Sequence, residues 1–175
     1  MEIKLATKQD VPKLLELRQK AFGALFDEFG INPDSLAENA SLDDAYEEFD
    51  ECTTLKAIND KGCIVGSVQG NVAYGLLFIG RLMVLPECQN NGIGRRLFRE
   101  IQSCLPHRHA WLCTCQQVRP PFEFYLREGF KPYKSEIVGP SLTWVYMEKA
   151  YSYLTLRDKP ELKDKAAESV KNVRT

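Results

Sequence analysis

The chain has 175 residues, of which 44% are hydrophobic and 27% are charged, and its formal net charge is -1. These values fit one globular domain of ordinary size and exclude an intrinsically disordered chain. A charge so near neutrality disfavours nucleic-acid binding, which needs a basic surface. No apolar run approaches the ~20 residues of a membrane span, and the start of the chain lacks the pattern of a signal peptide. We therefore expect a cytoplasmic protein with neither nucleic acid nor membrane as a partner.

The first third of the chain predicts one strand followed by two helices. Alternation at Ile3 and Leu5 predicts a strand over 3–6, and helical spacing of apolar residues predicts a helix over 10–25. Asp10 is positioned to cap this helix and Pro12 suits its first turn.

An acidic run follows, because the segment from Ala21 to Leu55 holds ten acidic residues and no lysine or arginine. Apolar residues keep helical spacing inside it, which predicts an amphipathic helix over at least 35–51 with an acidic outer face. The acidic residues are Asp27, Glu28, Asp34, Glu38, Asp43, Asp44, Glu47, Glu48, Asp50 and Glu51.

The rest of the chain predicts strands that alternate with two further helices, and therefore a mixed α/β sandwich. Its sheet would have six to seven strands in mixed parallel and antiparallel order, with helices on both faces. The predicted strands are 53–58, 63–71, 76–85, 110–115, 130–138 and 142–149, and the predicted helices are 93–105 and 121–128. Residues 1–150 would form one domain, and residues 151–175 a C-terminal extension that is either a tail, a packed helix or an arm that contacts another subunit.

A loop with two glycines joins a predicted strand to a predicted helix and has the character of an anion site. Backbone N–H groups at the start of a helix lack acceptors, and Gly92 and Gly94 allow a phosphate to approach the main chain. Arg95 and Arg96 add positive charge. Two glycines alone also fit a simple tight turn. The loop is not a Walker A site, since no Gly-Lys-Ser/Thr follows, and it lacks the third glycine of a dinucleotide fingerprint.

Two motifs in order carry a resemblance to a known family. Gln89-Asn90-Asn91-Gly92-Ile93-Gly94, preceded by a strand that ends in Val84-Leu85-Pro86, resembles the coenzyme A loop of the GNAT superfamily of N-acetyltransferases. About thirty residues further on, Phe124-Tyr125-Leu126-Arg127-Glu128-Gly129-Phe130 resembles the Tyr-x-x-x-Gly-Phe signature of that family. The order of predicted elements over residues 2–149 also matches it.

The resemblance implies acetyl-CoA as co-substrate, bound mainly by the main chain. The strand that ends at Val84 and the strand 110–115 would splay apart so that the pantetheine arm enters like an extra strand. Amides of residues 90–95 would hold the pyrophosphate, so the side chains of Asn90 and Asn91 could vary, and Gln89 would buttress the turn. The implied cofactor-binding residues are Leu82, Met83, Val84, Gln89, Asn90, Asn91, Gly92, Ile93, Gly94 and Arg95.

The family's catalytic groups map onto two residues of this chain. Tyr125 matches the usual general acid, which protonates the leaving thiolate; alternatively, its ring only packs and orients the thiol. The main-chain N–H of Val84 would stabilise the oxyanion. The general base is not evident, because the strand 76–84 contains no acid. Waters, or a glutamate of the acidic run, stay open for this role.

Two other features of the sequence bear on this interpretation. Val118 and Pro121 stand where the family often has Asn and Ala, so a cofactor hydrogen bond is either missing or made by Gln116 or Gln117. Arg81, a charge within an apolar strand, favours an ion pair with a carboxylate over a substrate contact.

A metal site and a disulfide framework are both disfavoured. Four possible metal ligands would share one side of an extended strand, namely His107, His109, Cys113 and Cys115. Trp111 lies between them on that side, and their spacing does not suit a closed tetrahedral site. We expect no metal, and cysteines that act as small core residues rather than as acyl carriers. All six cysteines are predicted to stay reduced thiols, namely Cys52, Cys63, Cys88, Cys104, Cys113 and Cys115.

The sequence therefore predicts an N-acetyltransferase that moves acetyl from acetyl-CoA to a primary amine by direct attack. The acidic run favours a small cationic acceptor through its summed field, unless that run is simply a solvated helix face. Two alternatives stay open, a non-catalytic acyl-CoA-binding or regulatory module and a peptide or protein N-terminal acetyltransferase. A homodimer is an expectation from the family alone.

Overall fold

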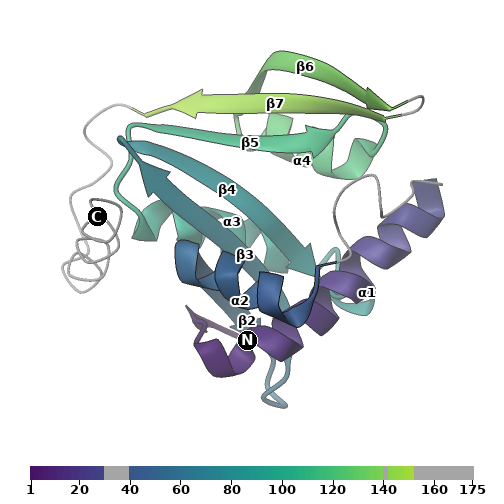
Figure 1. Cartoon of the computed structure of the whole chain (residues 1–175), viewed down its shortest axis with the longest axis vertical. Coiled ribbons are helices and arrows are strands. Elements are labelled where there is room, and N and C mark those ends of the chain that lie inside the picture. Colours follow the sequence, from purple (N-terminus) through teal and green to yellow (C-terminus); the bar gives the residue numbers. More distant parts are fainter. Residues whose placement is uncertain (30–39, 140–141, 152–175) are drawn as a thin grey trace. The chain divides into compact units, whose positions relative to one another are not determined.

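A computed structural model describes residues 1–29, 40–139 and 142–151 (Figure 1). Two compact units divide the chain: the first unit is Met1–Asn71 with Arg81–Ile101, and the second unit is Val72–Gly80 with Gln102–Thr175. The domain predicted over 1–150 contributes to both units, and residues 152–175 of the predicted extension lie outside the described residues.

Seven strands form one mixed sheet in the order β1-β2-β3-β4-β5-β7-β6, which confirms the predicted α/β class and element order. Pairing is antiparallel for β1 with β2, β2 with β3, β5 with β7 and β6 with β7, and parallel for β4 with β5. The strands are β1 (Glu2–Leu5), β2 (Thr53–Ile58), β3 (Ile64–Ala73), β4 (Leu76–Val84), β5 (His109–Cys115), β6 (Lys131–Gly139) and β7 (Leu142–Ala150). The helices are η1 (Lys8–Asp10), α1 (Val11–Phe29), α2 (Leu42–Glu51), η3 (Pro86–Cys88), α3 (Ile93–Cys104) and α4 (Arg119–Arg127).

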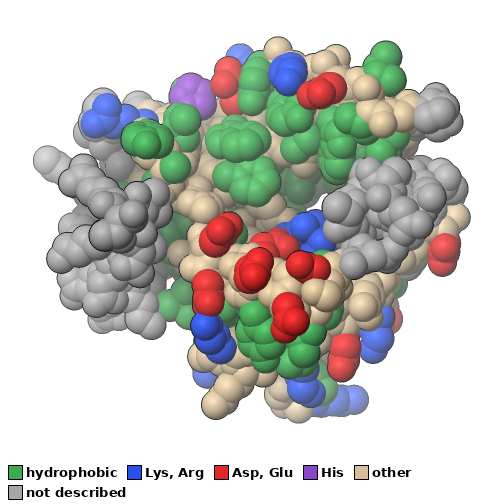
Figure 2. All heavy atoms as spheres, viewed as in Figure 1, with side chains coloured by type: hydrophobic (Ala, Val, Ile, Leu, Met, Phe, Trp, Pro, Cys, Tyr) green, Lys and Arg blue, Asp and Glu red, His purple; other side chains and the backbone are tan. Residues whose placement is uncertain are grey.

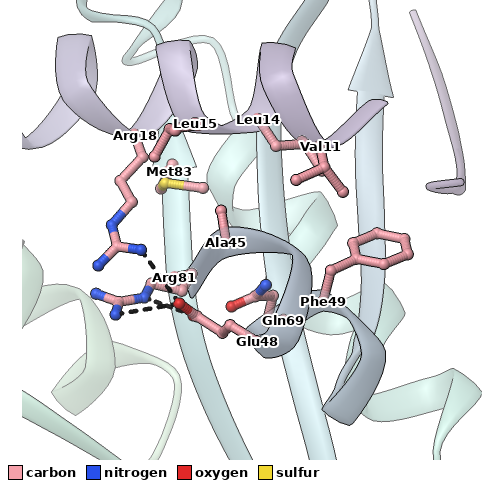
Figure 3. A pocket seen from close by; sticks show the side chains of 10 residues that line it. All are labelled: Val11, Leu14, Leu15, Arg18, Ala45, Glu48, Phe49, Gln69, Arg81 and Met83. Carbon is pink, nitrogen blue, oxygen red and sulfur yellow. Dashed lines mark hydrogen bonds and ion pairs between the residues drawn. The ribbon is translucent and has the colours of Figure 1, made fainter. Parts of the chain in front are cut away.

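In the first unit, helices cover both faces of the strands. A Cβ at Gly66 of β3 would meet Leu97 and Ile93 of α3, each within 3.2 Å, so α3 packs closely on that face. Gln69, three residues further along β3, lies on the opposite face, since side chains alternate along a strand. It faces α1 and α2 (Figure 3). The apolar stripe of α3 is buried as predicted.

The start of α1 differs from the prediction, because Asp10 is not its cap. Asp10 is the last residue of η1, and its Oδ2 accepts from the backbone N and Oγ1 of Thr7 at 2.7 and 2.9 Å. It also accepts from Lys56 Nζ at 2.6 Å. The carboxylate thus ties the turn before α1 to β2, which sequence spacing does not reveal.

The acidic helix is shorter than predicted in the part that the structure describes. Ser41 is the N-cap of α2, and its Oγ accepts from Asp44 N at 3.2 Å while Asp44 Oδ2 accepts from Ser41 N at 2.8 Å. This reciprocal capping box fixes the start of the helix at Leu42. Residues 35–39 of the predicted helix lie outside the described residues.

In the second unit, β5 pairs with β4 from Leu76↔His109 to Phe78↔Trp111 and with β7 along its whole length. Phe130 and Met147 are fully buried in this unit. Gly129 ends α4 with a φ of 88°, a left-handed conformation that glycine adopts without strain, and its N–H donates to Leu126 O at 3.0 Å. The predicted glycine cap is confirmed. No helix in the described parts of the chain is long and apolar enough to span a membrane.

Candidate functional site

The loop between β4 and α3 turns on two residues with left-handed backbone. Asn90 has a φ of 59° and Gly92 a φ of 75°. Asparagine tolerates this conformation better than most side chains, and glycine adopts it freely. A Cβ at Gly92 would meet no atom within 4 Å, so the outer side of the turn is open. Gly92 is therefore required by its backbone angle and not by crowding.

Side-chain amides hold the shape of this loop. Gln89 Nε2 donates to Val84 O at 3.1 Å, so Gln89 buttresses the turn as the sequence predicts. Asn91 Nδ2 donates to Gln89 O at 3.0 Å and to Cys88 O at 3.3 Å. That the side chains of Asn90 and Asn91 could vary stays a prediction, but each has a local role in the structure: Asn90 adopts left-handed backbone, and Asn91 donates hydrogen bonds within the loop.

The helix that follows directs its first amides into the loop. Arg96 N donates to Gly92 O at 3.1 Å, and this is the first bond that spans one turn. The amides of Ile93 and Gly94 precede it and have no acceptor within the helix. A Cβ at Gly94 would lie 3.6 Å from Val84 Cγ2, an ordinary contact. Open backbone donors at a helix N-terminus suit an anionic oxygen, so the loop fits a phosphate group.

A pocket in the first unit lies where α1, α2, β3 and β4 meet (Figure 3). Its polar groups come from Arg18, Glu48, Gln69 and Arg81. Its apolar side chains are Val11, Leu14, Leu15, Ala45, Phe49 and Met83. Apolar walls with a few convergent polar groups are typical of small-molecule sites.

Two guanidinium groups hold one carboxylate in this pocket. Glu48 Oε1 accepts from Arg81 Nε at 2.8 Å, and Oε2 accepts from Arg18 Nη1 at 3.1 Å (Figure 3). The Arg18 residue is only 5% exposed. Arg81 has a φ of 49° inside β4, a conformation that a non-glycine residue adopts at a cost unless contacts fix it. The ion pair predicted for Arg81 is confirmed, and it links α1, α2 and β4.

These ion pairs bear on the prediction that the acidic run attracts a cationic acceptor. Figure 2 shows acidic side chains gathered over α2. Glu48, however, faces basic residues from outside the acidic run, and Asp50 Oδ2 pairs with Lys8 Nζ at 2.7 Å. Asp43, Glu47 and Glu51 are exposed. The negative field of α2 thus comes from its outer carboxylates, because the carboxylate in the pocket is paired with two arginines and this cluster has a net positive charge.

Sequence reasoning missed Arg18, although a signal was present. Arg18 follows Leu14 by four residues and Val11 by seven, so helical spacing puts it on the buried face of α1. A charge on an apolar face needs a partner. The acidic run offered ten candidates, and only the packing of α2 on α1 selects Glu48 among the described ones.

Replacing Glu48 with glutamine is expected to lower the free energy of unfolding by about 1–3 kcal/mol, because Arg18 loses a charged acceptor in a buried position. Urea unfolding measures this difference. Glu47→Gln is the matched control, since Glu47 is the exposed neighbour, and it should change stability by less than about 0.5 kcal/mol. Equal effects of the two variants would show that the cluster does not support the fold.

Tyr125 lies on α4 in the second unit. Its ring centroid is 5.2 Å from that of Phe124, and its carbonyl accepts from Phe130 N at 3.0 Å. Burial raises the pKa of the Tyr125 hydroxyl well above its ordinary value. The phenol therefore stays protonated throughout the neutral range, which is the state a proton donor needs.

Gln117 does not present a free amide in place of the family's asparagine. Its Oε1 accepts from Thr143 N at 3.1 Å, and its Nε2 donates to Thr143 Oγ1 at 3.4 Å. Gln116 N donates to Thr143 O at 2.9 Å. The side chain of Gln117 is thus engaged with β7.

The histidines and cysteines near β5 are separated by the fold. His107 precedes β5, as the predicted strand 110–115 implies, and is buried, with Nδ1 2.7 Å from Leu105 O. His109 Nε2 lies 3.3 Å from Glu148 Oε2. Cys115 is buried as predicted, whereas Cys113 is only half-buried, and burial raises its pKa to about 11. Among the described residues no three metal-ligating side chains form a group.

This chain resembles known proteins both in sequence and in fold. Residues 50–132 match the family model of the acetyltransferase (GNAT) domain. The chain carries a GNAT domain. The matched range of this GNAT domain includes the loop after β4 and also Tyr125. No curated protein matches the chain significantly.

Solved acetyltransferase structures share the GNAT fold. The PaiA N-acetyltransferase from Thermoplasma acidophilum, in complex with coenzyme A, has a TM-score of 0.72 at 21% identity, covering 86% of this chain and 100% of that chain. A ribosomal-protein-alanine N-acetyltransferase from Brucella melitensis has a TM-score of 0.65 at 18% identity, covering 86% and 100%. An aminoglycoside 6'-N-acetyltransferase complexed with coenzyme A has a TM-score of 0.64 at 17% identity, covering 92% and 100%. At these identities the likeness establishes the fold.

Proposed function

We propose that this GNAT protein transfers the acetyl group of acetyl-CoA to a primary amine of a small acceptor by direct attack. One observation carries the proposal: within the matched GNAT range, β4 leads through two left-handed residues into the open N-terminus of α3. Backbone donors with no helical acceptor suit the pyrophosphate of coenzyme A. Two neighbours of the same fold are complexes with coenzyme A, which supports this donor.

The main chain would hold most of the cofactor. Amides of residues 90–95 would donate to the pyrophosphate, with Arg95 adding charge, and main-chain groups of Leu82, Met83 and Val84 would bond the pantetheine amides. The open space at Gly92 is compatible with this role, because no atom lies within 4 Å of a Cβ built there. The splay between Val84 and residues 110–115 stays a prediction.

Bound acetyl-CoA supplies an activated thioester. The chain would polarise the thioester carbonyl and protonate the leaving thiolate. The N–H of Val84 would donate to the thioester oxygen as charge develops there. Tyr125 would protonate the departing thiolate. The oxygens of Glu48 already accept from Arg18 and Arg81, so we assign Glu48 to shaping the pocket and leave the amine's proton to water.

The pocket of the first unit would receive the acceptor, since it combines apolar walls with an amide and a paired carboxylate. Release of coenzyme A thiol in a single turnover, with a panel of amines and N-terminal peptides, tests the activity. Thiol release that depends on a small amine supports the proposal. Release with peptides alone would favour an N-terminal acetyltransferase, and binding without release would indicate an acyl-CoA-binding module.

Acceptor charge is expected to matter through the outer carboxylates of α2. At low salt a short diamine should show a KM about 3- to 10-fold lower than a monoamine of the same length, and ~0.5 M salt should remove the difference. The double variant Glu47→Gln/Glu51→Gln should reduce it in the same way, because both side chains are exposed. A ratio of KM values that ignores both salt and these substitutions would contradict a cationic preference.

A further inference from the structure

Arg81 has left-handed backbone within a strand. Among the described residues, the non-glycine residues with positive φ are Tyr74, Arg81 and Asn90. Tyr74 and Asn90 lie in turns, whereas Arg81 lies inside β4 with a φ of 49°. A strand residue is normally extended, and a residue with a Cβ adopts left-handed backbone at a cost that its surroundings must offset. Contacts of the Arg81 side chain must therefore favour this conformation.

The Arg81 side chain is held by the carboxylate of Glu48. Arg81 Nε donates to Glu48 Oε1 at 2.8 Å and Nη2 donates to Oε2 at 3.5 Å, so the guanidinium engages both oxygens (Figure 3). A two-point contact between arginine and a carboxylate fixes orientation as well as distance. Glu48 Oε2 also accepts from Nη1 of the buried Arg18 at 3.1 Å, which holds the carboxylate in place. Glu48 of α2 thus determines where the Arg81 side chain lies.

The residues that directly follow Arg81 are those whose main chain would bind the donor. Residues 82–84 are held at their far end, because Gln89 Nε2 donates to Val84 O at 3.1 Å. Their near end depends on Arg81. Since φ and ψ are the soft dihedrals of the backbone, a change of Arg81 from left-handed to extended would re-aim the peptide groups that follow it. The direction of these groups therefore depends on the conformation of Arg81.

We propose that Arg81 is a positioning residue, held by Glu48, which aims the main-chain groups of residues 82–84 at the thioester arm of coenzyme A. The inference rests on the proposed function, because it takes this segment to bind the pantetheine. Ile79 and Met83, two residues before and after Arg81, are buried apolar residues. An apolar side chain at position 81 could also pack there, but it could not bind Glu48, and the backbone would be free to extend.

Two substitutions at Arg81 separate this role from a purely structural one. Arg81→Ala and Arg81→Gly both remove the ion pair, but glycine adopts left-handed backbone without steric cost. Calorimetry with coenzyme A should give a dissociation constant at least about tenfold higher for Arg81→Ala and within about threefold of wild type for Arg81→Gly. Glycine weakens an ordinary strand more than alanine does, so a structural role alone gives the opposite order.

Tyr74 provides the matched control. It has a φ of 53° and is fully exposed. Tyr74→Ala and Tyr74→Gly make the same two changes on left-handed backbone, and neither should alter the dissociation constant of coenzyme A. Any difference in melting temperature between these two variants measures the strain of alanine in this conformation without involving the proposed site.

Glu48→Gln tests the partner of Arg81. It should weaken the binding of coenzyme A by about 3- to 10-fold, because a neutral amide replaces the carboxylate that holds the guanidinium. Adding Arg81→Gly to Glu48→Gln should restore binding to the level of Arg81→Gly alone, since glycine needs no partner to keep its φ. This gain on a second change carries the test even if Arg81→Ala does not fold.

Melting temperatures without ligand ensure that affinities are compared between folded variants. The positioning role is overturned if Arg81→Gly binds coenzyme A no better than Arg81→Ala, or if Arg81→Gly does not improve the binding of Glu48→Gln. Failure of the proposed function gives a different result: the binding pattern holds, but wild type releases no thiol from acetyl-CoA with any amine. A wild type that does not bind coenzyme A would overturn both.

Discussion

An aspartate in place of Gly92 is expected to abolish the stabilisation of this protein by acetyl-CoA. A ligand at 100 times its dissociation constant stabilises the wild type by ~2.7 kcal/mol, which for a chain of this size raises the melting temperature by roughly 5–11 °C. The new carboxylate would lie in the open space beside the loop, where the proposed pyrophosphate binds. Juxtaposed like charges cost several kcal/mol, so the shift should fall to about zero at the same ligand concentration.

Gly92→Asn is the matched control for this experiment. Asparagine has nearly the shape of aspartate, carries no charge, and is among the residues that best tolerate the φ of 75° at this position. It should keep most of the thermal shift, although both variants lose some stability without ligand. An equal shift for the aspartate and asparagine variants would place the cofactor elsewhere on the molecule.

The second large effect is expected at Tyr125. Tyr125→Phe should lower kcat between about 10-fold and about 100-fold while the dissociation constant of acetyl-CoA stays the same, because phenylalanine keeps the ring and loses only the proton donor. General acids contribute ~10²–10⁴, and a thiolate is already a good leaving group, so the loss lies at the lower end. Pre-steady-state mixing separates this step from product release. Tyr74→Phe, on a fully exposed residue, should leave kcat unchanged.

The pH dependence of kcat tests the proton-donor role of Tyr125 independently. A proton donor acts in its protonated form, and burial raises the pKa of Tyr125, so activity that depends on it is lost only above that raised value. The kcat of the wild type should therefore not fall between pH 8 and about pH 10 through this group. An unchanged kcat in Tyr125→Phe would assign the ring to packing alone.

Local patterns were sufficient to predict the elements and the loop. The apolar stripe of α3 and the glycine cap at Gly129 depend on neighbours within a few residues, and both are where the spacing predicts. The same holds for Gln89, whose bond to Val84 O closes a turn of six residues. Interactions of short range are fixed by the order of residues, because few conformations compete.

The sequence by itself determined the mixed α/β order and the resemblance to the GNAT superfamily, and it predicted that the loop after β4 binds an anion. Tertiary structure alone decided that Asp10 binds Lys56 and does not cap α1, and that Arg18 and Arg81 converge on Glu48. The ion pairs join residues 30 or more positions apart. Such a partner is chosen by how helices and strands pack, since charge and periodicity along the chain leave many carboxylates equivalent until packing brings one within reach.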